Sequence, residues 1–351
     1  MPSSRLRVGQ YLPFFRERGI EATILPALPD PWFTRFCYSK SKILRFFHLA
    51  AEVLNAFRRA FLSRFYDVVF IQKGITLSNF RGLDRLFSRS SRPLVFDLDD
   101  SVFGLNAVEF RFPWLWALQD KGQTIKIARR ANAVIAGNAY LKDLTEDYNA
   151  NVFVIPTPVD TERILPEPSS RDPASSKTVI GWLGVPGGLI YFDLIAEALQ
   201  RLAKRYPLVL RIVSRLNGRH FSVPGVTMEY VDWDYACERR DLNAFDIGIA
   251  PMADDHWAKG KCSLKLLQYM AAGLPTVSSR SGMNQEVVED GVDGFLAEGT
   301  GEWFEKLSRL IGDIPLRKKM GEKARLKVVD HYSLKKNAER FSDLLFEVGR
   351  S

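Results

Sequence analysis

The sequence predicts an α/β protein with two Rossmann-like domains, each built around a parallel β-sheet. Three observations support this fold class. The chain has 351 residues, more than twice the usual length of one domain. Short apolar segments alternate with segments of helical periodicity, as in doubly wound sheets. A polar segment rich in Pro and Ser, residues 161–177, separates two halves of similar size.

Nine short apolar segments are expected to form buried parallel strands. Each has the length of a strand, is rich in β-branched or other apolar residues, and is followed by a helical pattern. The nine segments are residues 67–71, 93–98, 133–137, 152–156, 178–184, 208–214, 226–231, 246–251 and 275–279.

The Pro- and Ser-rich segment defines the domain organisation. We expect a first domain over residues 1–160, a linker over 161–177, a second domain over 178–332 and a terminal helix over 333–351. The chain opens with an amphipathic segment, residues 3–19, and no predicted strand precedes it. A doubly wound domain normally begins with a central strand. Either the true start lies upstream, or the first domain lacks its first strand.

Composition restricts the class of protein. Hydrophobic residues make up 46% and charged residues 26%, the balance of a soluble globular protein. No uncharged apolar run reaches the ~18 residues of a spanning helix, and the first ten residues have no apolar leader. The three cysteines are far apart and odd in number, which fits neither a disulfide framework nor a zinc site. We therefore expect a protein of the reducing cytoplasm.

Positive charge is concentrated near the N-terminus. The net charge is +8, and residues 1–66 hold eleven Lys and Arg against four Asp and Glu, a surplus of seven. Within this region, residues 31–65 interleave aromatic and basic side chains. The pattern is typical of a helix lying on an anionic membrane surface, here the inner face, or of an arm for a phosphorylated acceptor. It also fits a solvated basic face whose aromatic residues belong to the core. Nucleic acid is a poorer partner because no recognised binding motif accompanies the charge.

The segment GKCSLKLLQYMAAGLP (260–275) is the most informative one. A helix is expected from about Lys261 to Ala272, after Gly260, which permits close approach of the backbone. Free amides and the positive end of the dipole make a helix N-terminus a phosphate site. Lys261 and Lys265 are four residues apart and share one face, with Gln268 on the same side. These groups suit a diphosphate followed by a ribose. On periodicity alone, an amphipathic helix with a solvent-exposed lysine face is the favoured explanation of the pattern.

This segment, followed by GMNQEVVEDGVDGFL (282–296), resembles the donor-binding half of the family-4 glycosyltransferases with the GT-B fold. The closest similarity is to a bacterial branch with an altered Glu-x7-Glu motif. In that motif the first Glu contacts the donor sugar and the second holds the ribose hydroxyls. The resemblance puts the second position at Gln268, which can still bind ribose, and the first at Gly260, which cannot replace a carboxylate. It implies further polar sugar contacts from Asn284 and Glu286.

The resemblance covers most of the chain. VIGWLGVPGG (179–188) is similar to the first strand and glycine loop of the family's nucleotide-binding domain, with Gly184 and Gly187 close to the donor. The family often has an Arg/Lys pair just after this loop. The chain lacks that pair, so Lys261 and Lys265 are expected to supply the charge. Further similar strings, in the same order, are residues 3–15, 93–100, 131–138, 155–160 and 245–262.

The segment PLVFDLDDSVFG (93–104) supports three interpretations. Asp97-Leu98-Asp99 matches the metal-binding Asp-x-Asp of the other glycosyltransferase fold, but it lies in the domain remote from the expected nucleotide. Asp97 and Asp99 also resemble the nucleophile and acid of haloacid-dehalogenase-like phosphatases, although Ser101 stands where Thr is usual. The GT-B resemblance instead puts Asp99 or Asp100 where the family often has a His that contacts the donor. A carboxylate there can bind an acceptor hydroxyl or stabilise positive charge on the sugar. A helix-capping role is the structural alternative.

Two other polar residues are candidates for the same cleft. His256 lies in the segment before the expected donor helix and is able to reach a sugar or a phosphate. Asn138 follows an apolar strand and either faces the cleft or forms a turn.

The resemblance implies two Rossmann-like domains that face each other across a cleft. The first domain is expected to bind the acceptor and the second the nucleotide sugar. The reaction is transfer of a hexose-like unit from a UDP- or GDP-linked donor to a hydroxyl acceptor, with retention of configuration and no obligatory metal or cofactor. Lys261 and Lys265 are expected to neutralise the departing diphosphate, and Asp99 to act as the catalytic carboxylate. Bacterial surface polysaccharide or glycolipid assembly is the implied role.

Two alternatives remain open from the sequence. The first is a phosphatase of the haloacid-dehalogenase type that uses Asp97 as its nucleophile. The second is a non-catalytic nucleotide-binding protein, favoured by Gly260 in place of the family Glu and by the missing first strand.

Overall fold

The computed structural model contains two compact units, and each is described by itself. The first unit comprises residues Met1–Pro156 and Ala338–Ser351, and the second comprises Thr157–Asn337. The structure describes residues 2–28, 41–76, 79–88, 92–100, 120–167, 177–216 and 221–350. Residues 31–40 of the basic aromatic segment, residues 168–176 of the expected linker, and Ser101 therefore lie outside the described residues.

The first unit is built on a four-stranded parallel sheet with the order β1-β2-β3-β4. The central strands β2 (Leu94–Leu98) and β3 (Ala133–Ala136) are buried along their whole length. This is the pattern expected of parallel strands with helices on both faces. The outer strands are β1 (Val69–Gln72) and β4 (Val152–Val154). Within the described residues, no strand precedes β1.

The amphipathic N-terminal segment folds as three short helical turns that pack on the last helix of the chain. The rings of Tyr11 and Phe15 each lie 5.1 Å from the ring of Phe341, edge to face. The helical elements of this unit are α1 (Pro2–Arg7), η1 (Gly9–Tyr11), α2 (Leu12–Glu17), α4 (Lys42–Leu62), η2 (Ser63–Phe65), α5 (Leu83–Ser88), α7 (Gln123–Arg130), α8 (Ala139–Glu146) and most of α16 (Leu334–Arg350).

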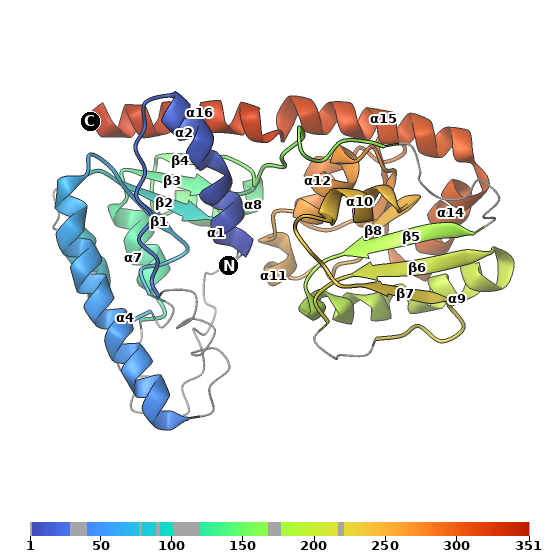
Figure 1. Ribbon diagram of the computed structural model, residues 1–351, viewed down its shortest axis with the longest axis horizontal. Helices are drawn as coiled ribbons and strands as arrows, with labels where there is room; N and C mark the ends of the chain where they lie inside the picture. The colour runs from blue at the N-terminus through green and yellow to red at the C-terminus, as the bar shows by residue number, and fades with distance from the viewer. Residues whose placement is uncertain are drawn as a thin grey trace. The chain divides into compact units, whose positions relative to one another are not determined.

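The second unit is built on a six-stranded parallel sheet with the order β10-β9-β8-β5-β6-β7. Figure 1 labels the part of this sheet formed by β8, β5, β6 and β7. The strands are β5 (Thr178–Leu183), β6 (Leu208–Val213), β7 (Met228–Val231), β8 (Ile247–Ala250), β9 (Thr276–Ser279) and β10 (Phe295–Ala297). The helical elements are η3 (Pro186–Leu194), α9 (Ala196–Arg205), α10 (Glu238–Asn243), α11 (His256–Lys259), α12 (Leu264–Ala271), α13 (Asn284–Val287), α14 (Gly299–Gly312) and α15 (Ile314–His331).

Two buried clusters enclose this second sheet. One contains α12 residues such as Leu266 and Met270, and the other contains Trp182, Phe192 and Trp303. Trp182 and Trp303 are no more than 2% exposed. Apolar side chains on both faces of the sheet explain why its strands appear in the sequence as continuous apolar runs.

The strand predictions are confirmed, one further strand was missed, and the start of one helix needs correction. All nine predicted strands are present within two residues of the expected bounds, whereas β10 was not predicted. The helix expected from Lys261 to Ala272 is α12, which begins only at Leu264 after the separate short helix α11. Residues 161–167 of the expected linker belong to the second unit, where Ile164 is buried and its carbonyl accepts from Arg325 at 2.6 Å. No helix in the described part of the chain is long and apolar enough to cross a membrane.

Candidate donor-binding site

The topology of the second sheet marks where a ligand is expected. β5 is the first strand of this unit in sequence, and it lies inside the sheet between β8 and β6. β6 and β7 extend the sheet on one side of β5, and β8, β9 and β10 extend it on the other. The strand order therefore reverses between β5 and β8. Ligands of open α/β sheets bind at the carboxyl ends of the strands beside such a reversal.

The loop after β5 is a tight glycine loop packed on Trp182. A Cβ atom on Gly184 would lie 2.7 Å from the indole, and one on Gly188 would lie 3.0 Å from it. Only glycine leaves the backbone this close to the ring. At Gly187 a Cβ would meet no atom within 4 Å, so this side of the loop is open. The loop thus exposes backbone directly at the carboxyl end of the first strand.

Lys265 brings a cation to the same loop. The Nζ of Lys265 lies 4.8 Å from the centroid of the Trp182 ring. A Cβ atom on Gly188 would lie 3.9 Å from the same Nζ. Burial, with a smaller contribution from nearby Lys261, lowers the pKa of Lys265 from 10.5 to about 8. A cation is costly at this position unless an anion joins it. The position of the Lys265 ammonium group therefore indicates a binding site for an anion.

Lys261 and the residues before it lie at the same end of α12. The Nζ of Lys261 is 4.0 Å from the centroid of the Trp257 ring. Trp257 is 37% exposed, and His256, which begins α11, is also exposed. Gly260 is buried at the C-cap of α11 and offers only its backbone.

Ser263 turns the chain into α12. Its φ is +45°, an uncommon left-handed conformation for a residue other than glycine. Its Oγ donates to Asn284 Oδ1 at 2.7 Å, and Asn284 Nδ2 donates to the Ser279 carbonyl at 3.0 Å. The amide of Leu266 donates to the Ser263 carbonyl at 3.0 Å. The amides of Leu264 and Lys265, at the first two positions of α12, therefore come before the first hydrogen bond of the helix. Asn284, expected to contact the sugar, is buried and fixes this turn instead.

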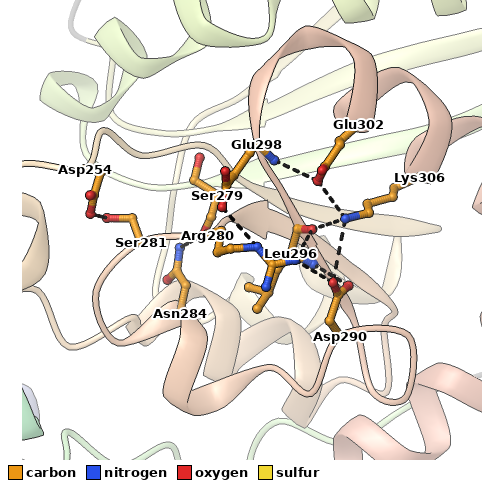
Figure 2. A network of polar contacts seen from close by, with 10 residues as sticks. All are labelled: Asp254, Ser279, Arg280, Ser281, Asn284, Asp290, Leu296, Glu298, Glu302 and Lys306. Carbon is orange, nitrogen blue, oxygen red and sulfur yellow. Dashed lines mark hydrogen bonds and ion pairs between the residues drawn. The ribbon is translucent and has the colours of Figure 1, made fainter.

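Polar contacts join the neighbouring loops, and Figure 2 shows them. Ser281 Oγ donates to the Ala253 carbonyl at 2.9 Å and to Asp254 at 3.0 Å. Arg280 forms an ion pair with Asp290 at 2.7 Å. These contacts hold the loop after β9 against the loop after β8. The amino end of α12 is therefore pre-formed.

Gln268 lies on the next turn of α12 and is bound to a buried carboxylate. Its Nε2 donates to Glu238 Oε1, and Arg163 donates to the same oxygen at 3.2 Å. Glu238 is fully buried, and its Oε2 has no hydrogen-bond partner among the described residues. Because an ionised carboxylate only accepts hydrogen bonds, the Gln268 amide nitrogen must face Glu238. The carbonyl oxygen of Gln268 is thereby directed away from Glu238.

Glu286 lies apart from these contacts. It is exposed on α13, where its charge adds to burial in raising the pKa of Tyr332. Its expected role as a sugar contact stays a prediction.

The polar residues of the first unit form two separate arrangements. Asp97 is fully buried and forms an ion pair with Arg7, whose Nε donates to both carboxylate oxygens at 3.1 and 3.2 Å. By contrast, Lys73 Nζ lies 3.3 Å from Asp99 and 3.4 Å from Asp100. Burial lowers the pKa of Lys73, but the two carboxylates outweigh it, so the net shift is upward. This Lys73 cluster is at the carboxyl ends of β1 and β2.

Asn138 has a local structural function. It is fully buried, and its Oδ1 accepts from the amide of Leu141 at 2.8 Å as the N-cap of α8. Its expected role in the cleft stays a prediction.

Residues 182–313 match the family model of Glycosyl transferases group 1. The matched range contains the glycine loop, α11, α12 and the loop after β9. It thus covers every contact described above at the amino end of α12.

Two curated proteins are similar over part of this chain. N-acetyl-alpha-D-glucosaminyl L-malate synthase of Bacillus anthracis is 31% identical over 94 residues, which are 26% of this chain and 25% of that protein. Trehalose synthase of Pyrococcus horikoshii is 25% identical over 164 residues, 47% of this chain and 34% of that protein. The chain therefore matches about a third or less of the length of these relatives.

Solved structures resemble almost the whole chain. Anabaena Alr3699/HepE in complex with UDP has a TM-score of 0.63 and 17% identity, with coverage of 84% of this chain and 82% of that one. A glycosyltransferase from Rickettsia africae has a TM-score of 0.67 and 14% identity, with coverage of 97% and 93%. These likenesses establish the fold: the chain has the two Rossmann-like units of GT-B glycosyltransferases, as the sequence predicts.

Sequence reasoning missed three residues of these arrangements. Glu238 is distant from Gln268 in sequence, and no periodicity connects them. Trp182 is buried in the core of the second unit, and the centroid of its ring also lies 4.8 Å from the Lys265 Nζ. Lys73 follows an apolar strand with a φ of +61°, and a Lys-Gly pair at a strand end is the single signal that the sequence offered.

Proposed function

We propose that this chain is a glycosyltransferase that moves a hexose-like unit from a nucleoside-diphosphate sugar to a hydroxyl acceptor. The observation that carries the proposal is the half-buried ammonium group of Lys265 beside the glycine loop at the amino end of α12. Such a cation at a sheet reversal suits a diphosphate. The group 1 match over this region supports the same conclusion.

In the proposed complex the diphosphate contacts Lys265, Lys261 and the first amides of α12. The ribose follows along the helix, where the carbonyl oxygen of Gln268, on the side away from Glu238, accepts from a ribose hydroxyl. Glu238 makes this possible because it fixes the orientation of the amide. UDP- and GDP-linked sugars both fit this description. UDP is the first to test, since a complex with UDP has been solved for the Anabaena protein.

The reaction breaks the bond between the sugar C1 and the diphosphate oxygen and forms a bond from C1 to the acceptor oxygen. The acceptor loses its proton, and the diphosphate leaves with the electron pair. Lys261 and Lys265 stabilise the negative charge that develops on the diphosphate, so no metal is required. We further propose retention of configuration, binding of the acceptor hydroxyl at Asp99 and Asp100, and a role in bacterial surface polysaccharide or glycolipid assembly.

Transfer assays with UDP- and GDP-sugars test the proposal. Lys261→Ala and Lys265→Ala should each lower kcat about 10²- to 10³-fold, the typical effect of removing one group that stabilises transition-state charge. Lys204→Ala, on the exposed side of α9, is the matched control and should leave kcat unchanged. Wild-type rates in both site variants would refute the assignment.

The rival functions make different predictions. A phosphatase nucleophile must reach its substrate, whereas Asp97 is fully buried against Arg7, so the structure argues against that alternative. A non-catalytic protein would bind the nucleotide without hydrolysis or transfer for any acceptor. Detection of a glycosylated product would exclude it.

A further inference from the structure

The long helix α4 has an inner face that belongs to the first unit. Its buried side chains recur at helical spacing: His48, Leu49, Glu52, Ala56, Arg59 and Ala60 are at most 9% exposed. Arg59 donates to the Ile75 carbonyl at 2.7 Å. This face accounts for the folding of the helix.

The opposite face of α4 is apolar as well, yet it is exposed. The five large apolar residues are between 51% and 70% exposed: Phe46, Phe47, Leu54, Phe57 and Phe61. At 3.6 residues per turn they fall within one arc of about 100°, separate from the buried arc. Phe65, in η2, continues the row at 69% exposed, with its ring 5.8 Å from that of Phe61. We call these six residues the aromatic stripe.

The aromatic stripe is about 28 Å long, since Phe65 lies 19 residues after Phe46 and the helical rise is about 1.5 Å per residue. Scattered exposed apolar residues need no explanation, but a continuous row of this length marks an interaction surface. Figure 1 shows α4 at the margin of the first unit.

Charge identifies the partner. Arg58 and Arg64 are exposed beside the stripe, and the Arg64 guanidinium lies 5.0 Å from the centroid of the Phe61 ring. The single acidic residue of the helix, Glu52, is fully buried. The exposed face therefore combines aromatic rings with positive charge and carries no acidic residue of the helix. Helices with this combination lie in the interface of an anionic membrane, where the rings enter the acyl boundary and the arginines remain at the headgroups.

We propose that the aromatic stripe of α4 binds the surface of an anionic lipid bilayer. The inference rests on exposure, periodicity and charge, and it is independent of the proposed activity.

The test is co-sedimentation of the full chain with vesicles of phosphatidylglycerol and phosphatidylcholine, and with vesicles of phosphatidylcholine alone. We expect binding to the anionic vesicles that weakens as salt is added, because the charge contribution is screened. The double variant Phe57→Ser/Phe61→Ser should bind at least about tenfold more weakly, since two rings no longer enter the bilayer. Leu326→Ser, which removes a residue 64% exposed on α15, is the control and should bind as the wild type does.

Circular dichroism and thermal unfolding will show that the exposed-face variants remain folded. Equal binding to neutral and anionic vesicles would overturn the proposal, and so would unchanged binding by the double variant. A dimer in sedimentation equilibrium that the double variant abolishes, without vesicle binding by the wild type, would assign the stripe to a second copy instead.

Discussion

Replacing Lys265 by Met should stabilise the protein while abolishing donor binding. The folded chain holds the Lys265 ammonium half-buried against Trp182, and its pKa falls from 10.5 to about 8. Each pKa unit is worth 1.36 kcal/mol, so the charged form costs up to about 3 kcal/mol of stability below pH 8. Met has a similar length and keeps the contact with the ring. The variant should therefore gain up to about 3 kcal/mol, a rise in Tm of about 5 to 10 °C.

The pH dependence of unfolding checks the physical cause. Between about pH 8 and 10.5 the unfolded chain keeps the Lys265 proton that the folded chain has lost. The wild type should therefore gain stability from this group as pH rises through that range, and Lys265→Met should lack the gain.

Lys261→Met provides the matched comparison for this experiment. Lys261 contacts Trp257 at the same end of α12. Its replacement should weaken donor binding without raising Tm. Calorimetric titration with UDP and thermal unfolding at pH 7 supply both quantities. A Lys265→Met protein that is no more stable than the wild type and binds UDP equally well would refute the reasoning.

Three further predictions concern other contacts. UDP binding to the wild type should weaken as pH rises from 7 to 9, because Lys265 loses its charge near pH 8; titrations with equal affinities at both values would contradict this. Gln268→Glu should weaken UDP binding at least about tenfold, because it sets two carboxylates side by side. Adding Glu238→Gln to this variant should restore the affinity for UDP. A double variant that binds UDP no better than Gln268→Glu would argue against the role of the Gln268–Glu238 hydrogen bond. Arg7→Met should destabilise the chain by about 3 to 5 kcal/mol, because it leaves Asp97 buried without its cation. An unchanged Tm would contradict this predicted loss of stability.

Local patterns predicted much of the fold. Six of the nine predicted strands, β2, β3, β5, β6, β8 and β9, are buried along all or nearly all of their length, so their sequences are nearly continuous apolar runs. The strand β10 was missed because its apolar run, Phe295–Ala297, is only three residues long and lies between Gly294 and Glu298. The start of α12 was misplaced because it depends on Ser263 in a left-handed conformation, which is held by Asn284 far along the chain.

The candidate site, like the fold, was predicted only in part from the sequence. Lys261 and Lys265 were predicted from helical spacing, but Lys261 precedes α12, so the left-handed turn at Ser263 and not one helix face relates the two side chains. Their ring contacts come from Trp257 on α11 and Trp182 on β5, and sequence spacing alone does not indicate the contact between Lys265 and the distant Trp182. Glu238 was not predicted, because it is 30 residues from Gln268 in the sequence and only the fold brings the two side chains together.

A crystal structure of the full chain with UDP or GDP tests the central claim most directly. The account predicts that the Nζ atoms of Lys261 and Lys265 lie about 2.7 to 2.9 Å from phosphate oxygens, with the diphosphate at the first amides of α12. A nucleotide bound elsewhere, with both ammonium groups facing solvent, would contradict it.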